Sequence, residues 1–66
     1  MEITVNGGRR EVADGAPLLS LLDLLHLPAA ATVVELNGQV LDRARYPELA
    51  LAPNDVLELV RFVGGG

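Results

Sequence analysis

The sequence predicts an α+β fold in which a mixed sheet of about five strands carries one main helix on one face. Three observations support this prediction. Strand-like segments flank two Asn-Gly turn signals, at 6–8 and at 37–38. A leucine-rich segment with helical spacing separates these two pairs of strands, and another strand-like segment follows near the C-terminus.

The first hairpin is predicted from alternation and turn chemistry. Residues 1–6 alternate between apolar and polar side chains, which indicates a strand with one buried face. The Asn-Gly-Gly segment at 6–8 suits the positive φ values of a tight turn, so we expect a second, more polar strand over about 9–13. Arg9 and Arg10 are expected to form a solvated edge of this hairpin.

The next segment predicts the main helix. Residues 14–16 break the strand, and Pro17 suits the first turn of a helix. Four leucines at helical spacing form an apolar stripe, and these are Leu18, Leu21, Leu22 and Leu25. Pro28 is expected to end the helix. His26 lies near that end without a partner motif, so we expect a structural role for it and not a catalytic one.

The second half of the chain predicts three more strands. Residues 32–37 are rich in β-branched side chains, and Asn37-Gly38 is a strong hairpin signal leading into a strand at 39–41. Residues 42–53 lack a clean period and suggest a packed turn or short helix. The last predicted strand covers 56–63. Aspartates at turns are expected to cap them, namely Asp14, Asp42 and Asp55.

Two hairpins joined by a crossover helix favour the ubiquitin-like β-grasp arrangement. In this arrangement the first and last strands pair side by side at the centre of the sheet. We therefore expect residues 1–63 to form the β-grasp domain. Residues 64–66 are all glycine, and we expect them to form a flexible C-terminal tail because glycine retains the most backbone freedom.

Composition argues against several classes of function. The 66 residues include no cysteine and one histidine, so we expect no disulfide and no metal site. The net charge is −4 without a basic cluster beyond Arg9 and Arg10, which disfavours binding to nucleic acid. The apolar runs are too short to span a membrane, and we see no signal peptide. We expect a cytoplasmic location.

The remaining chemistry lies in the glycine tail. Gly64 and Gly65 have no side chains, so they could thread a narrow cleft in a partner. The reactive group is the α-carboxylate of Gly66. A carboxylate is a poor electrophile, but adenylation by ATP makes its carbonyl carbon open to attack by sulfur or nitrogen nucleophiles.

The final predicted strand also suggests a docking surface. If Leu57 and Leu59 face the helix, alternation places Glu58, Val60 and Phe62 on the open face of the sheet. Val60 and Phe62 would then form an apolar patch for a partner, directly before the tail. The alternative is that the strand twists at its end and buries Phe62 at the sheet edge.

Across its length, the chain resembles the ThiS family, the sulfur carrier proteins of thiamine biosynthesis. These are relatives of ubiquitin and of the molybdopterin synthase small subunit. The matching features are Ile3-Thr4-Val5-Asn6-Gly7, Ala13-Asp14-Gly15, Leu36-Asn37-Gly38, the turn before Val56, and the diglycine Gly65-Gly66. Gly64 is a departure, since other residues are also common there in the family.

The resemblance implies a carrier cycle and not an enzyme, with no catalytic residue and no bound cofactor. An adenylating enzyme related to ubiquitin-activating enzymes would use ATP to form an acyl-adenylate at Gly66. A persulfide donor would then give a thiocarboxylate, whose sulfur passes to thiazole synthase. Two alternatives stay open: a carrier for molybdopterin or another sulfur-containing metabolite, and a ubiquitin-like protein modifier.

Overall fold

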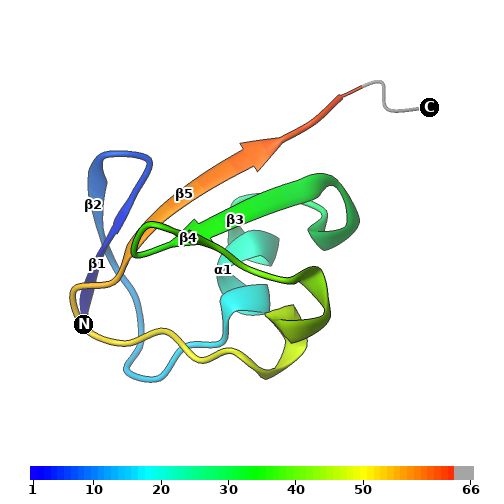
Figure 1. Ribbon diagram of the computed structural model, residues 1–66. Helices are drawn as coiled ribbons and strands as arrows, with labels where there is room; N and C mark the ends of the chain where they lie inside the picture. Colours follow the sequence, from blue (N-terminus) through cyan, green and yellow to red (C-terminus); the bar gives the residue numbers. More distant parts are fainter. Residues whose placement is uncertain (64–66) are drawn as a thin grey trace.

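A mixed sheet organises the computed structural model, which describes residues 1–63. Within these residues five strands pair in the order β2-β1-β5-β3-β4 (Figure 1). Their bounds are Glu2–Val5 (β1), Gly8–Glu11 (β2), Thr32–Leu36 (β3), Gln39–Val40 (β4) and Val56–Arg61 (β5). β1 and β5 run parallel, whereas the other neighbours are antiparallel. The predicted β-grasp arrangement is confirmed, including the pairing of the first and last strands.

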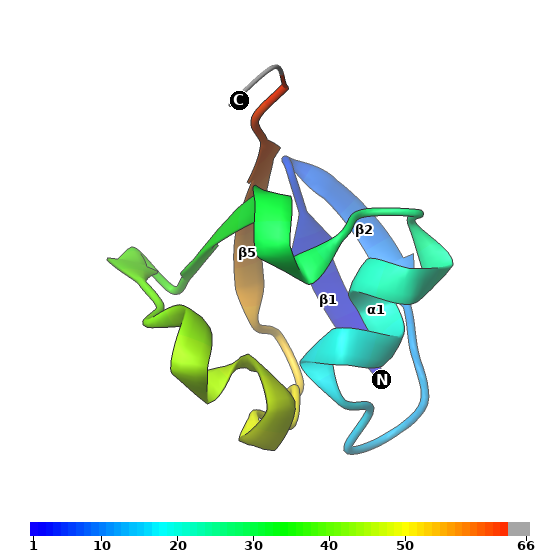
Figure 2. The same ribbon diagram turned by 90° about the vertical axis from the view of Figure 1, so that its right-hand side faces the viewer.

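The helix α1 (Leu18–Leu24) covers one face of the sheet (Figure 2). It begins directly after Pro17, and Leu18, Leu21 and Leu22 of the predicted stripe are buried. The core also contains residues from β1, β3, β5 and the segments that follow β4. These are Ile3, Val34, Tyr46, Leu51, Leu57 and Leu59.

The end of α1 differs from the prediction that Pro28 ends it. The helix stops at Leu24 because His26 takes a left-handed conformation, with φ of 58°. The His26 N–H donates to the Asp23 carbonyl (3.1 Å), and the Leu27 N–H donates to the Leu22 carbonyl (2.8 Å). This pair of hydrogen bonds satisfies carbonyls that the last helical turn leaves open. His26 therefore lies at the end of the helix, as expected, and it ends the helix through its backbone conformation.

The irregular segment after β4 contains a 3-10 helix, η2 (Arg43–Glu48). Its Tyr46 side chain is buried against β3. The Tyr46 hydroxyl donates to the Thr32 carbonyl (2.9 Å) and accepts from the Val34 N–H (3.0 Å). Since β4 has only two residues, this hydroxyl satisfies part of the β3 edge that β4 leaves unpaired. A second 3-10 helix, η1 (Ala29–Ala31), leads into β3.

Two predicted strands end earlier than expected. β2 stops at Glu11 instead of residue 13. Val12 still bonds to Met1, since its N–H donates to the Met1 carbonyl (2.9 Å) and its carbonyl accepts from the Met1 ammonium (2.7 Å). β5 stops at Arg61 instead of residue 63, because β3 begins at Thr32, the residue that pairs with Arg61. No helix within residues 1–63 is long and apolar enough to cross a membrane.

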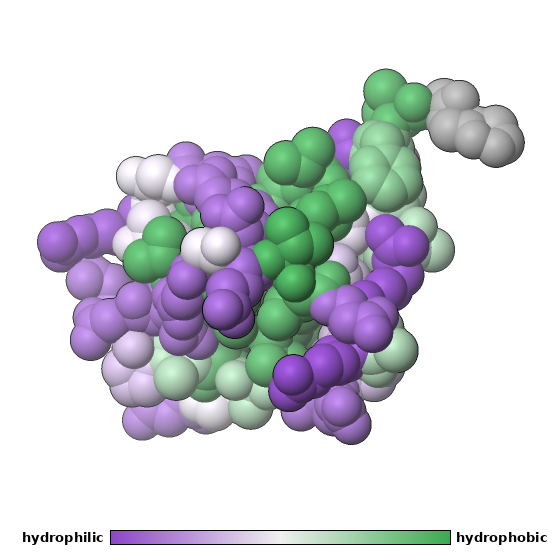
Figure 3. Space-filling view, in the orientation of Figure 1, coloured by the Kyte–Doolittle hydropathy of each residue, from purple (hydrophilic) through white to green (hydrophobic). Residues whose placement is uncertain are grey.

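Apolar side chains also remain at the surface near the end of the described chain. Figure 3 shows a strip of them on one side of the molecule and more where the chain leaves β5. Those at the end of β5 are Val60, Phe62 and Val63. Hydrophilic side chains cover much of the surface beside this strip.

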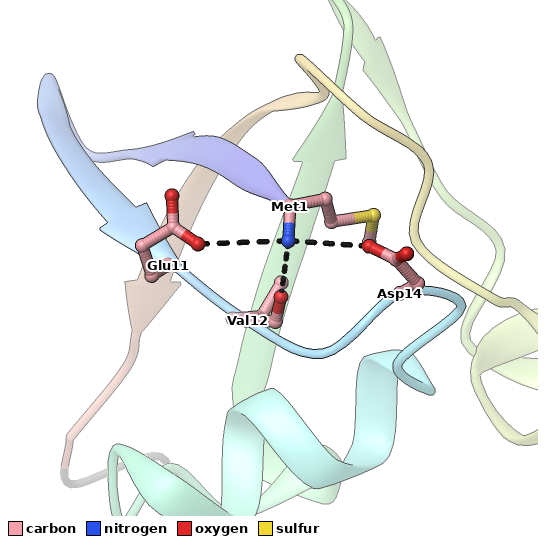
Figure 4. A network of polar contacts seen from close by, with 4 residues as sticks. All are labelled: Met1, Glu11, Val12 and Asp14. Atoms are coloured by element: carbon pink, nitrogen blue, oxygen red, sulfur yellow. Dashed lines mark hydrogen bonds and ion pairs between the residues drawn. The ribbon is translucent and has the colours of Figure 1, made fainter.

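A polar network joins the N-terminus to the end of β2 and to the segment between β2 and α1 (Figure 4). The Met1 ammonium donates to the Val12 carbonyl (2.7 Å) and lies 3.6 Å from a Glu11 carboxylate oxygen and 3.3 Å from one of Asp14. The hydrogen bond to Asp14 is the main reason why the pKa of this ammonium is raised above its ordinary value of 8.0. Partial desolvation lowers the pKa, and the negative charges of Glu11 and Asp14 raise it. The two carboxylates are 79% and 93% exposed, so water screens the attraction.

This network predicts a pH dependence of stability for a protein that begins at Met1. The folded chain holds the ammonium proton more tightly than the unfolded chain. The added stability is therefore present below about pH 8 and is lost as the pH rises through the raised pKa. In Asp14→Asn, the free energy of unfolding should fall less as the pH rises. Urea unfolding between about pH 7 and about pH 10 measures it, with Glu48→Gln as a control far from Met1. Equal slopes for wild type and Asp14→Asn would contradict the prediction.

Candidate functional site

The end of β5 is the part of the structure that precedes the three C-terminal glycines. β5 lies between β1 and β3, and its chain continues past the rest of the sheet (Figures 1 and 2). Gly64, Gly65 and Gly66 lie outside the described residues, so the predictions of a threading tail and a reactive carboxylate rest on the sequence. What the structure describes is the platform that precedes them.

Alternation along β5 confirms the predicted orientation of its side chains. Leu57 and Leu59 are buried, whereas Val60 is 59% exposed and Phe62 is 48% exposed. The Phe62 N–H donates to the Ala31 carbonyl (3.0 Å), which holds the backbone extended one residue past the strand. The alternative in which Phe62 is buried at the sheet edge is wrong. Docking at Val60 and Phe62 stays a prediction.

The strand register adds residues that sequence reasoning missed. Val33 lies opposite Val60, and Glu35 lies opposite Glu58, so each pair shares the open face of the sheet. This face is therefore apolar near the tail and acidic farther from it. The valines are visible in the sequence, but which of them meets Val60 depends on the register between β3 and β5, for which no local signal exists.

Asn6 fixes the other side of β5. Its φ of 49° begins the turn predicted at 6–8, as expected. Its side-chain amide also makes two hydrogen bonds to the backbone of Leu59. Oδ1 accepts from the Leu59 N–H (2.7 Å), and Nδ2 donates to the Leu59 carbonyl (3.2 Å). The amide thus occupies the place of the next β1 residue in the ladder. Sequence reasoning assigned Asn6 to the turn and missed this bridge.

Other polar candidates have local structural roles in the described part of the chain. Asp42 accepts from the Ala44 N–H (3.2 Å), and Asp55 accepts from the Ala52 N–H (2.8 Å), so the capping roles of both are confirmed. Arg9 pairs with Glu2 at 3.2 Å on the exposed hairpin. Across residues 1–63 no group of three metal-binding side chains comes together. The chain end stays the candidate site that the sequence predicts.

Comparisons with known proteins point to one family. The model of the ThiS family matches residues 3–66. The sulfur carrier protein ThiS of Bacillus subtilis is 38% identical over 53 residues, which cover 80% of this chain and 80% of that protein. A crystal structure of the thiamine biosynthesis protein ThiS from Geobacter metallireducens superposes with a TM-score of 0.83 at 36% identity and full coverage of both chains.

Two longer proteins also contain a similar segment. The thiazole synthases of Paramagnetospirillum magneticum and Magnetococcus marinus are 30% and 35% identical over 66 residues. The match covers 100% of this chain but only 20% of each of those proteins.

Proposed function

The chain belongs to the ThiS family, and from this premise we propose that it carries sulfur for thiamine thiazole formation on the carboxylate of Gly66. The observation that carries the proposal is that the family match extends through residue 66, so the glycine tail lies inside the similarity. The sulfur carrier of Bacillus subtilis supports the carrier role. The two similar thiazole synthases support thiazole synthase as the acceptor of the sulfur.

The proposed chemistry takes place at the carbonyl carbon of Gly66. A carboxylate oxygen attacks the α-phosphorus of ATP on an adenylating enzyme, and pyrophosphate leaves. A persulfide sulfur then attacks the acyl carbon, and AMP leaves. A thiol cleaves the resulting sulfur–sulfur bond and frees the thiocarboxylate. The partner enzymes supply the catalytic groups, so the chain acts as a carrier and not as a catalyst. Because activation needs ATP, we place the carrier in the cytoplasm.

The composition of the chain protects its activated end from self-reaction. The sequence contains no lysine and no cysteine, and its five basic side chains are arginines, which stay protonated. The remaining amine is the α-amino group of Met1. Its raised pKa and its contacts with Asp14 and Glu11 keep it protonated, and therefore non-nucleophilic, at neutral pH. The acyl-adenylate therefore persists until the sulfur donor or water attacks it.

We propose the open face beside the tail as the surface that these enzymes contact. Val60, Phe62 and the neighbouring Val33 form an apolar patch directly before residue 64. Burying this patch against a partner would bring Gly66 toward the partner's active site. Binding of the domain and presentation of the tail then use the same end of β5.

The position of the reactive carboxylate predicts a strict requirement at residue 66. Deleting Gly66, or adding one alanine after it, should abolish ATP–pyrophosphate exchange catalysed by the adenylating enzyme. Both changes lie beyond the last described strand, so circular dichroism and the unfolding midpoint should match those of the wild type. Normal exchange by the extended protein would contradict the carrier proposal.

The docking patch predicts separate effects on binding and stability. Phe62→Glu places a charge on the contact surface, where its desolvation is costly, so the KM for the carrier in pyrophosphate exchange should rise about tenfold or more. Stability should change little, because Phe62 is already 48% exposed. The control is Leu24→Glu, which puts the same charge on an exposed leucine of α1. An unchanged KM, or a large loss of stability, would refute the assignment of Phe62 to docking.

A further inference from the structure

The two edges of β5 are paired to different extents. Successive residues of a strand direct their backbone N–H and C=O groups to opposite sides. Toward β3, the Val56 carbonyl accepts from the Asn37 N–H (2.8 Å), and the Phe62 N–H still donates to Ala31 (3.0 Å). Toward β1, the Leu57 carbonyl accepts from the Asn6 N–H (2.9 Å). The β3 side is therefore paired along the whole strand, from residue 56 to residue 62.

The β1 side is paired only as far as Leu59. The Asn6 amide makes the last contacts there, at 2.7 and 3.2 Å, and the chain then turns away into β2. By the same alternation, the N–H and C=O of Arg61 and then of Val63 point to this side. β1 pairs with β5 only at Val56 and Leu57, so on the β1 side no strand of the described chain lies opposite Arg61, whereas Thr32 of β3 pairs with it on the other side.

This stretch has the properties of an edge that accepts a further strand. Its backbone is held extended from the β3 side as far as Phe62. Val60 and Phe62 offer an exposed apolar row next to it. Open edges with extended backbone and adjacent apolar side chains are the sites at which peptides add to sheets, through main-chain hydrogen bonds.

We propose that the adenylating enzyme, on receiving the glycine tail, adds an extended strand of its own to the β1 side of β5 at residues 61–63. The added strand would pair with the N–H and C=O of Arg61. It would lie on the same side of β5 as β1, past the point at which the chain turns at Asn6. The inference rests on the proposed function, since that function requires an enzyme to hold the chain immediately before residue 64. Strand addition fixes the direction in which the tail leaves the domain.

Charge favours an enzyme strand over a second copy of this chain. Two copies that paired antiparallel about Arg61 would place two guanidinium groups directly opposite each other, which destabilises a strand pair. The two chains would also repel through a net charge of −4 each. An enzyme strand with an acidic side chain beside Arg61 would avoid both the facing guanidinium groups and the repulsion between two copies of this chain.

The test compares two substitutions at one residue. Arg61→Pro removes the N–H on the open edge, a place where proline is tolerated in sheets, whereas Arg61→Ala removes the same side chain and keeps the N–H. In ATP–pyrophosphate exchange, the KM of Arg61→Pro should exceed that of Arg61→Ala about tenfold or more, with both variants folded. Equal KM values would overturn the inference. If wild type itself gives no exchange, the carrier proposal fails instead.

Amide hydrogen exchange of the wild-type chain gives a second readout that does not depend on how the proline variant folds. In the free protein the Phe62 amide should exchange slowly and the Arg61 amide quickly, because only the former is bonded. Bound to the adenylating enzyme, the Arg61 amide should slow about a hundredfold or more. Unchanged exchange at Arg61 in the complex would contradict strand addition. Self-association of the free chain that Arg61→Pro abolishes would identify a second copy as the occupant and also overturn it.

Discussion

Hydrogen bonding of β5 to strands on both of its sides is the constraint on which the rest of the structure depends. β5 joins the N-terminal hairpin to the second hairpin, and Leu57 and Leu59 place it in the core under α1. Beyond Arg61, which pairs with the first residue of β3, the described chain continues with Phe62 and Val63. The same strand therefore connects the two hairpins and directly precedes the segment to which the proposed carrier function is assigned.

Side chains complete the backbone pairing that such short strands leave open. The Asn6 amide continues β1 along β5, and the Tyr46 hydroxyl serves the β3 backbone beyond the two residues of β4. Asn37 acts similarly, since its Oδ1 accepts from the Val56 N–H at 2.9 Å. A chain of 66 residues has little room for long strands. The side chains of Tyr46 and Asn6 satisfy buried and partly buried backbone groups, and that of Asn37 satisfies an exposed one.

The elements that were predictable from sequence are those encoded by local pattern. The leucine spacing located α1, the Asn-Gly at 37–38 located the second hairpin, and alternation placed Phe62 on the open face. What sequence could not predict depends on contacts between distant segments. The bridge from Asn6 to Leu59, the facing pair Val33 and Val60, and the early end of β5 all follow from the register between strands, which no short window of sequence contains.

The central claim is that the Gly66 carboxylate is the sulfur-carrying group, and intact-mass spectrometry tests it most directly. The chain would be incubated with its adenylating enzyme, ATP and a sulfide source, with a reaction lacking ATP as the control. The account predicts a single new species in which one oxygen is replaced by sulfur, with fragmentation placing the sulfur on residue 66, and none of it without ATP. An unchanged mass in the complete reaction, or covalent adducts between two copies of the chain as the main product, would contradict the account.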